Sequence, residues 1–116
     1  MNKREMERAV KRGAKLLDNK MPDWHKKINL NVLKMNVGVQ HYATDCGCIG
    51  AQLAFANKDV VKGWISTMMK LFGALDYTKA VKFGFVPQEF LIARPYSPEP
   101  WEYLTKLWKI EVNKRV

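Results

Sequence analysis

A short apolar stretch near the middle of the chain, residues 45–56, most limits what this sequence can fold into. It is the most apolar run in the sequence, and Ile49, Leu53 and Ala56 recur in it at helical spacing. Small residues such as Gly50 lie between the large ones and allow a neighbouring helix to approach closely. The stretch therefore predicts a buried central helix, around which amphipathic helices pack.

The rest of the chain supplies those amphipathic helices. A 3.6-residue apolar period predicts helices over residues 2–18, 58–72, 79–83 and 98–115, with Trp24 as a core anchor between the first two elements. A short two-stranded β ribbon from residues 28–35 and 89–94 is an open alternative, because Ile28-Asn29-Leu30 alternates like a strand. A short helix over residues 32–35 that begins at Asn31 is the other interpretation of the first segment. The expected fold is mainly α, a single compact domain of about five helices over residues 1–116.

Length and composition agree with a small globular protein. The 116 residues suit one domain, and 47 % hydrophobic residues are enough for a core. No apolar run approaches the roughly 20 residues that span a bilayer, and the charged N-terminus does not resemble a secretory signal. We therefore expect a cytoplasmic protein without a membrane segment, whose two cysteines are reduced thiols.

The charge of the chain is strongly positive, with 20 basic and 11 acidic residues and a formal net charge of +9. Residues 1–34 hold ten Lys or Arg and four Asp or Glu, a net charge of +6. Such an excess favours anionic partners: nucleic acid, nucleotides or an acidic protein surface.

Four of these cations form what we call the basic stripe, Arg4, Arg8, Lys11 and Lys15. On the predicted first helix they lie opposite the apolar face, on successive turns, and such a stripe can follow a polyanion. The simpler interpretation is a solvated helix face. No helix-turn-helix, zinc-finger or RNA-recognition signature accompanies the stripe, so sequence-specific reading of DNA is not predicted.

A second set of residues predicts a pocket for a small anionic ligand. Aromatic side chains outside the apolar stripes are free to stack on such a ligand, and basic residues elsewhere can hold its charge. The candidate residues are Lys26, Lys27, His41, Tyr42, Arg94 and Tyr96.

Metal and catalytic chemistry find weaker support. His25, His41, Cys46 and Cys48 are the only His and Cys residues, and their spacing does not fit the usual zinc motifs, so two buried thiols and two polar histidines are the simpler interpretation. A cysteine nucleophile with His41 as its base is an alternative without identifiable oxyanion donors. Phosphate-binding glycine motifs are missing from the sequence. We expect a protein that is not an enzyme and has no cofactor.

Several short pieces that span most of the chain form a recognisable pattern. They are Gly13-Ala14-Lys15-Leu16-Leu17-Asp18, Pro22-Asp23-Trp24, Ile28-Asn29-Leu30 with Leu33 and Met35, Asp45-Cys46, Ile49-Gly50-Ala51-Gln52-Leu53, Phe83-Gly84-Phe85, and Leu104-Thr105-Lys106-Leu107-Trp108 with Glu111. This pattern resembles a family of small uncharacterised proteins from bacteriophages and from actinobacterial genomes that carry prophages. The chain differs from that family at Cys48 and in residues 90–98, where the family is more acidic. The resemblance implies a phage-encoded protein of the host cytoplasm and brings no catalytic residues with it.

Three functions remain open at this point, and we favour the first, because the second lacks a recognised element for reading nucleic acid. The first is a non-catalytic protein that binds or sequesters a nucleotide-type ligand and so antagonises a host defence, which predicts a concave pocket with converging basic residues. The second is a nucleic-acid-binding protein that uses the basic stripe, which predicts a continuous basic surface and binding that weakens with salt. The third is an inhibitor of a host or defence protein, which predicts an exposed apolar patch. A homodimer is compatible with all three.

Overall fold

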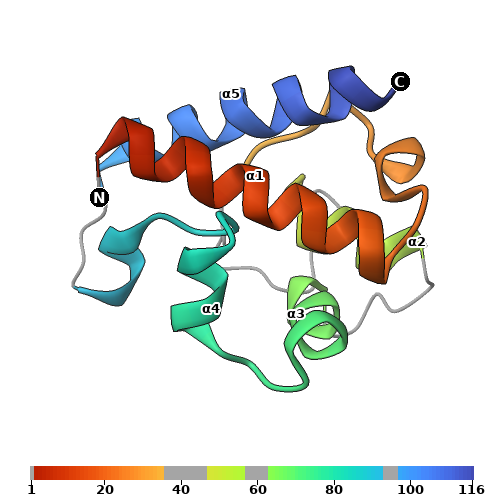
Figure 1. The fold of residues 1–116 in the computed structure, drawn as a ribbon, viewed down its shortest axis with the longest axis horizontal. Helices are drawn as coiled ribbons and strands as arrows, with labels where there is room; N and C mark the ends of the chain where they lie inside the picture. The colour runs from red at the N-terminus through yellow and green to blue at the C-terminus, as the bar shows by residue number, and fades with distance from the viewer. Residues whose placement is uncertain (1, 36–46, 57–62, 93–96) are drawn as a thin grey trace.

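The structure is a computed structural model, which describes residues 2–35, 47–56, 63–92 and 97–116 (Figure 1). All regular elements in these ranges are helices. These ranges hold no strand. The elements are α1 (Lys3–Lys20), a 3-10 turn η1 (Trp24–Lys27), α2 (Ile49–Ala56), α3 (Trp64–Phe72), α4 (Tyr77–Lys82), a second 3-10 turn η2 (Gln88–Leu91) and α5 (Pro98–Arg115). The radius of gyration is 12.8 Å, near the roughly 13 Å expected of a compact chain of this length. The predicted mainly α fold with five helices is confirmed.

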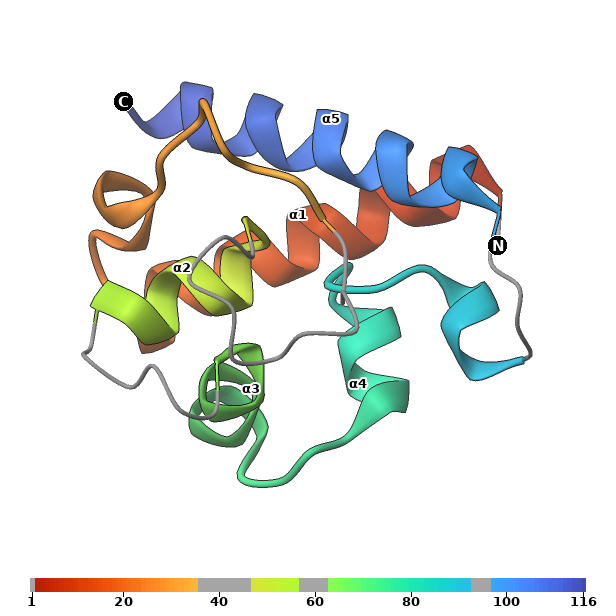
Figure 2. The ribbon, with the colours of Figure 1, turned by 180° about the vertical axis from the view of Figure 1, so that it is seen from behind.

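The two long helices α1 and α5 lie side by side and run in the same direction (Figures 1 and 2). Two side-chain contacts join them along their length. The Tyr103 hydroxyl donates to the Glu7 carboxylate at 2.7 Å, and Arg115 binds Asp18 at 2.9 Å near the other end. The contacts join residues 96 and 97 positions apart in sequence, so the two helices keep one register over the whole seam.

The central helix α2 is the most deeply buried element, as the sequence predicts. Every residue from Ile49 to Ala54 is buried. Its closest neighbour is α3, and the Thr67 hydroxyl donates to the Gly50 carbonyl at 2.7 Å across that contact. A Cβ atom at Gly50 would lie 3.0 Å from the Cβ of Trp64, so the small residue permits the close approach of the two helices.

Two tryptophans lie at the centre of the core. Trp24 and Trp108 are fully buried and meet edge to face with ring centroids 5.8 Å apart. Each indole N–H has an acceptor, at Asp18 for Trp24 (2.8 Å) and at the Gly84 carbonyl for Trp108 (2.7 Å). Burying an indole without such an acceptor would be costly, so these bonds also fix the orientation of the rings. Trp24 is the core anchor that the sequence predicts.

Helix α4 ends where it touches α1. Gly84 has a φ of +77°, and the N–H groups of Gly84 and Phe85 donate to the carbonyls of Val81 and Ala80, which is the Schellman arrangement that glycine favours. On the α1 side, a Cβ atom at Gly13 would overlap the carbonyl oxygen of Phe83. A residue without a side chain is therefore needed where these two helices cross.

The predicted β ribbon is wrong for the residues that the structure describes. The segment of residues 28–35 makes its backbone bonds to other partners. Asn29 exchanges bonds with the Gln52 side chain, the Lys34 N–H donates to the Gly47 carbonyl, and the Met35 N–H donates to the Thr105 hydroxyl. On the other side, residues 88–91 wind into η2 instead of extending. Asn31 lies in a turn and starts no helix.

Helix boundaries agree with the sequence prediction to within a few residues wherever the structure describes them. Asp76 caps α4 by accepting from the Lys79 N–H, and Gly73 ends α3 in a left-handed conformation. Ser97 precedes α5 with Pro98 at its start, but the serine side chain makes no capping bond. The predicted start of the third element at Asn57 lies outside the described residues, and α3 begins at Trp64.

Candidate functional site

The basic stripe is the first candidate site, and the structure places it on the outer face of α1. Helix α1 crosses the front of the molecule in Figure 1, with the other helices beside and behind it. Its buried residues, from Met6 to Leu17, face the core, and all four cations of the stripe are exposed. Within the described part of the chain, none of the four forms an ion pair or a side-chain hydrogen bond.

The acidic residues of α1 have a different role, because two of the three are bound to α5. The hydrogen bond from Arg115 holds the pKa of Asp18 below its ordinary value, against the opposing effect of burial, and the Trp24 N–H lowers it further. The same bond raises the pKa of Arg115. Glu7 accepts the Tyr103 hydroxyl, and this bond raises the pKa of the phenol. Both carboxylates are therefore engaged in the seam. Asp18 is charge-paired with Arg115, whereas Glu7 keeps its negative charge, because a phenol donates a hydrogen bond without neutralising the carboxylate.

On the side of α1 that faces α4, further basic residues lie next to the helix. The Arg12 guanidinium donates to the backbone carbonyl of Lys82 at 3.1 Å, which brings the end of α4 against α1. Lys79 and Lys82 are exposed on α4. The positive surface therefore extends from the stripe through Arg12 towards α4.

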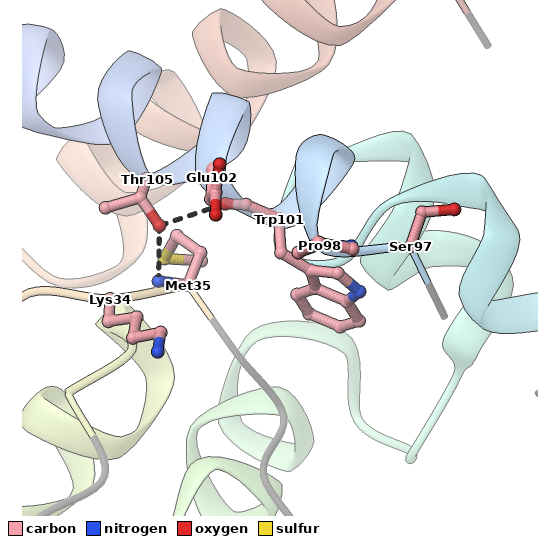
Figure 3. Close-up of a pocket in the computed structure, with 7 residues that line it drawn as sticks. All are labelled: Lys34, Met35, Ser97, Pro98, Trp101, Glu102 and Thr105. Carbon is pink, nitrogen blue, oxygen red and sulfur yellow. Dashed lines mark hydrogen bonds between the residues drawn. The ribbon is translucent and has the colours of Figure 1, made fainter. Parts of the chain in front are cut away.

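A pocket of about 360 Å³ is the second candidate site, between the segment that ends at Met35 and the first turns of α5. Figure 3 shows Lys34 extending from one side and the Trp101 ring from the other. Between them, the Thr105 hydroxyl accepts from the Met35 N–H at 2.8 Å and donates to the Trp101 carbonyl at 2.9 Å. We call this the Lys34 pocket; its lining residues are Lys34, Met35, Ser97, Pro98, Trp101, Glu102 and Thr105.

Of the predicted ligand-binding residues outside the basic stripe, the two that the structure describes do not line this pocket. Lys26 and Lys27 are exposed on η1, past the C-terminal end of α1, and Lys26 forms a 3.5 Å ion pair with Asp23. Four further candidates lie outside the described residues and stay predictions: His41, Tyr42, Arg94 and Tyr96.

The weak metal and nucleophile candidates are likewise only partly described. Cys48 is buried, and its sulfur accepts from the Ala51 N–H at 3.3 Å at the start of α2. His25 is half-buried with its ring edge-on to Trp24, while His41 and Cys46 lie outside the described residues. In the part of the chain that the structure describes, no three His, Cys, Asp or Glu side chains gather in a way that could hold a metal ion.

Sequence reasoning missed the residues of the Lys34 pocket. Trp101 falls on the apolar stripe of α5 and reads as core, which it largely is, with 8 % of its surface exposed. Thr105 follows Trp101 by one helical turn, on the same side of the helix. A hydroxyl group next to an apolar stripe is the one local feature that could have indicated this pocket. Its partner Met35 is 70 residues away in sequence, so no local pattern predicts their contact.

Comparison of the chain with protein-family models, with curated proteins and with solved structures found no match. The resemblance to phage proteins therefore stays a prediction. None of the described helices combines the length and apolar character that crossing a membrane requires.

Proposed function

We propose that the protein binds the phosphate backbone of nucleic acid through the outer face of α1. One observation carries this proposal: the four cations of the basic stripe are exposed and unpaired within the described residues, while Glu7 and Asp18 of the same helix are bound to α5. A charged surface made only to keep a helix soluble does not require this separation of signs. Here it leaves Glu5 as the one acid of α1 that is not bound to α5, next to the four cations of the stripe.

The dimensions of the stripe suit a duplex. Arg4 and Lys15 are eleven residues apart, which corresponds to about 16 Å along an α-helix. One strand of B-DNA presents a phosphate about every 3.4 Å along the axis, so the stripe is as long as roughly five base-pair steps. Arg12 and Lys82 can add contacts on the α4 side. The expected binding is independent of base sequence, because it uses long cationic side chains that reach phosphates.

The two other predicted functions find less support in the described residues. A nucleotide-type ligand as first predicted needs several converging cations, and the described lining of the Lys34 pocket has one. Exposed large apolar side chains such as Val32, Met69 and Ile110 lie on different elements; only Leu91 and Ile92 are neighbours in sequence. Antagonism of a host defence, a host protein partner and a homodimer stay predictions.

The proposal is tested by the salt dependence of binding to a labelled duplex of arbitrary sequence, measured by fluorescence anisotropy. If the stripe contacts four phosphates, log Kobs should fall with log salt concentration with a slope of about −3.6. Arg8→Gln/Lys11→Gln removes both charges with little change in helix propensity and should make that slope shallower by about 1.8.

A matched control is Lys106→Gln/Lys109→Gln, which removes the same charge from exposed positions on the outer side of α5. It should change the slope by much less than the α1 variant. Equal effects of the two double variants would show that only net charge matters, and the proposal would then be wrong. The same conclusion follows if wild-type protein does not bind the duplex at low salt.

A further inference from the structure

The Lys34 pocket has walls that are fixed before any ligand arrives. The Thr105 hydroxyl bonds to the Met35 N–H on one wall and to the Trp101 carbonyl on the other, so it uses both its acceptor and its donor inside the protein. Close by, the Lys34 N–H donates to the Gly47 carbonyl at 3.2 Å and ties the same segment to the start of α2. A pocket whose walls are held in this way loses little conformational entropy on binding.

The chemistry of the lining is mostly apolar with one positive charge. Met35 and Trp101 are buried and form the apolar part together with Pro98. Lys34 is exposed, and within the described residues its ammonium group forms no ion pair, not even with Glu102 at the same pocket. Thr105 has no free polar atom to offer. The described lining therefore provides an apolar wall, one cation opposite it (Figure 3) and one carboxylate.

We propose that this pocket binds a small aromatic anion, with its ring against Trp101 and Pro98 and its charged group at Lys34. The volume of about 360 Å³ is at the lower end for ligand sites, so one or two fused rings fit and a dinucleotide does not. Glu102 disfavours a second negative charge on the ligand. A carboxylate carries one negative charge, whereas the phosphate of a nucleoside monophosphate carries close to two near neutral pH. Aryl carboxylates are therefore the favoured source of such a ligand, and nucleoside monophosphates are the second source to be tested.

This site is independent of the basic stripe, because the pocket lies between the residue 34–35 segment and α5, and its described lining contains no residue of α1. Loss of one function therefore leaves the other measurable. Arg8→Gln/Lys11→Gln should bind the small anion as the wild type does.

The test is isothermal titration calorimetry with the intact protein and paired probes: 2-naphthoate with 2-naphthamide, and adenosine monophosphate with adenosine. The anion of a pair should bind about tenfold more tightly than its neutral partner, and Lys34→Gln should remove most of this difference. Lys106→Gln is the control, since it removes a cation from α5 outside the pocket. Preference for the carboxylate or for the phosphate pair identifies the source of the ligand.

Two more variants keep the result unambiguous. Glu102→Gln should tighten anion binding about two- to threefold, because it removes a repelling charge. Weaker binding of the anions would mean that Glu102 supports their binding instead of opposing it, and would overturn the proposal. Thr105→Val should weaken binding while Thr105→Ser, which keeps the hydroxyl, should not. Absence of binding by every probe, or equal binding of anions and their neutral partners, would also overturn it.

Discussion

Towards α5, the charged side chains of α1 are held in place: Arg115 binds Asp18, and Tyr103 binds Glu7. On the outer face of the same helix, the four cations of the basic stripe have no such partners within the described residues. Both faces carry charged residues, but these residues have opposite roles in the fold. Charges that join helices are used for stability, and charges that have no internal partner are available to a ligand. Variants on the two faces should therefore separate loss of stability from loss of binding.

The largest expected effect comes from the buried face. Gly13→Ala places a methyl group against the carbonyl oxygen of Phe83 and near the Trp108 ring, and backbone atoms there can move only if α1 and α4 separate. We expect a loss of about 3 kcal/mol in the free energy of unfolding, measured by urea titration. Gly73→Ala is the control: it has a φ of +72° but open space around it, and should cost about 1 kcal/mol. Equal losses would contradict the tight crossing at Gly13.

A smaller effect is expected at the seam with α5. Asp18→Asn keeps an acceptor for the Trp24 N–H but loses the ion pair with Arg115. We expect the free energy of unfolding to fall by about 1 to 2 kcal/mol at neutral pH. The loss is not larger because the carboxylate is 43 % exposed and solvent screens its charge. Folding lowers the pKa of Asp18 from its ordinary 3.8. Its contribution is therefore complete above that pH and is lost as the pH falls through the lower folded pKa.

The pH dependence gives this seam its own test. Between neutral pH and the acid range below the ordinary Asp pKa, wild-type protein should lose more stability than Asp18→Asn, so the two unfolding curves should converge as the pH falls. Parallel curves would mean that the ion pair adds nothing to stability.

On the outer face, Arg8→Gln/Lys11→Gln should change the free energy of unfolding by less than about 0.5 kcal/mol, because exposed positions without partners rarely contribute more. Thermal or urea unfolding measures this on the sample used for duplex binding. A loss well above 1 kcal/mol would show that the stripe has a structural role. The weaker duplex binding of this variant would then follow from its lower stability and not from the missing contacts to phosphates.

The smallest expected effect is a titration. Tyr103 donates to Glu7, and this bond raises the pKa of the phenol above its ordinary 10.0. Glu7→Gln should bring the phenolate signal of one tyrosine to lower pH in an absorbance titration. Lys3, whose ammonium lies 5.3 Å from the centre of the Tyr103 ring, remains in place in that variant. No change would mean that the bond does not persist in solution.

Local patterns in the sequence predict much of this fold. The spacing of Ile49 and Leu53 predicts the buried helix, and Trp24, which follows the helix-breaking Pro22, is recognisable as an anchor. Gly84 is predictable as a helix end because the residue type matches the left-handed conformation. In each case the deciding interactions lie within a few residues of one another or depend only on burial.

Long-range polar contacts could not be predicted in this way. The segment of residues 28–35 looks like a strand because its side chains alternate, yet the Gln52 and Thr105 side chains take up its backbone groups. Those partners are 23 and 70 residues away. The basic stripe was predictable because it is a property of one helix, whereas the Lys34 pocket exists only after two distant segments meet.

The parallel register of α1 and α5 also determines when the fold can form. During synthesis the apolar face of α1 is complete after Lys20, but Arg115, which closes the seam, is added 95 residues later. At about 5 to 20 residues per second this delay is roughly 5 to 20 s. Throughout that time the nascent chain cannot complete the α1–α5 seam, and the Trp108 ring that covers Gly13 is still missing for most of it. The seam should therefore form only after α5 has been synthesised, and ribosome-bound chains that lack α5 should be more sensitive to proteases than chains that contain it.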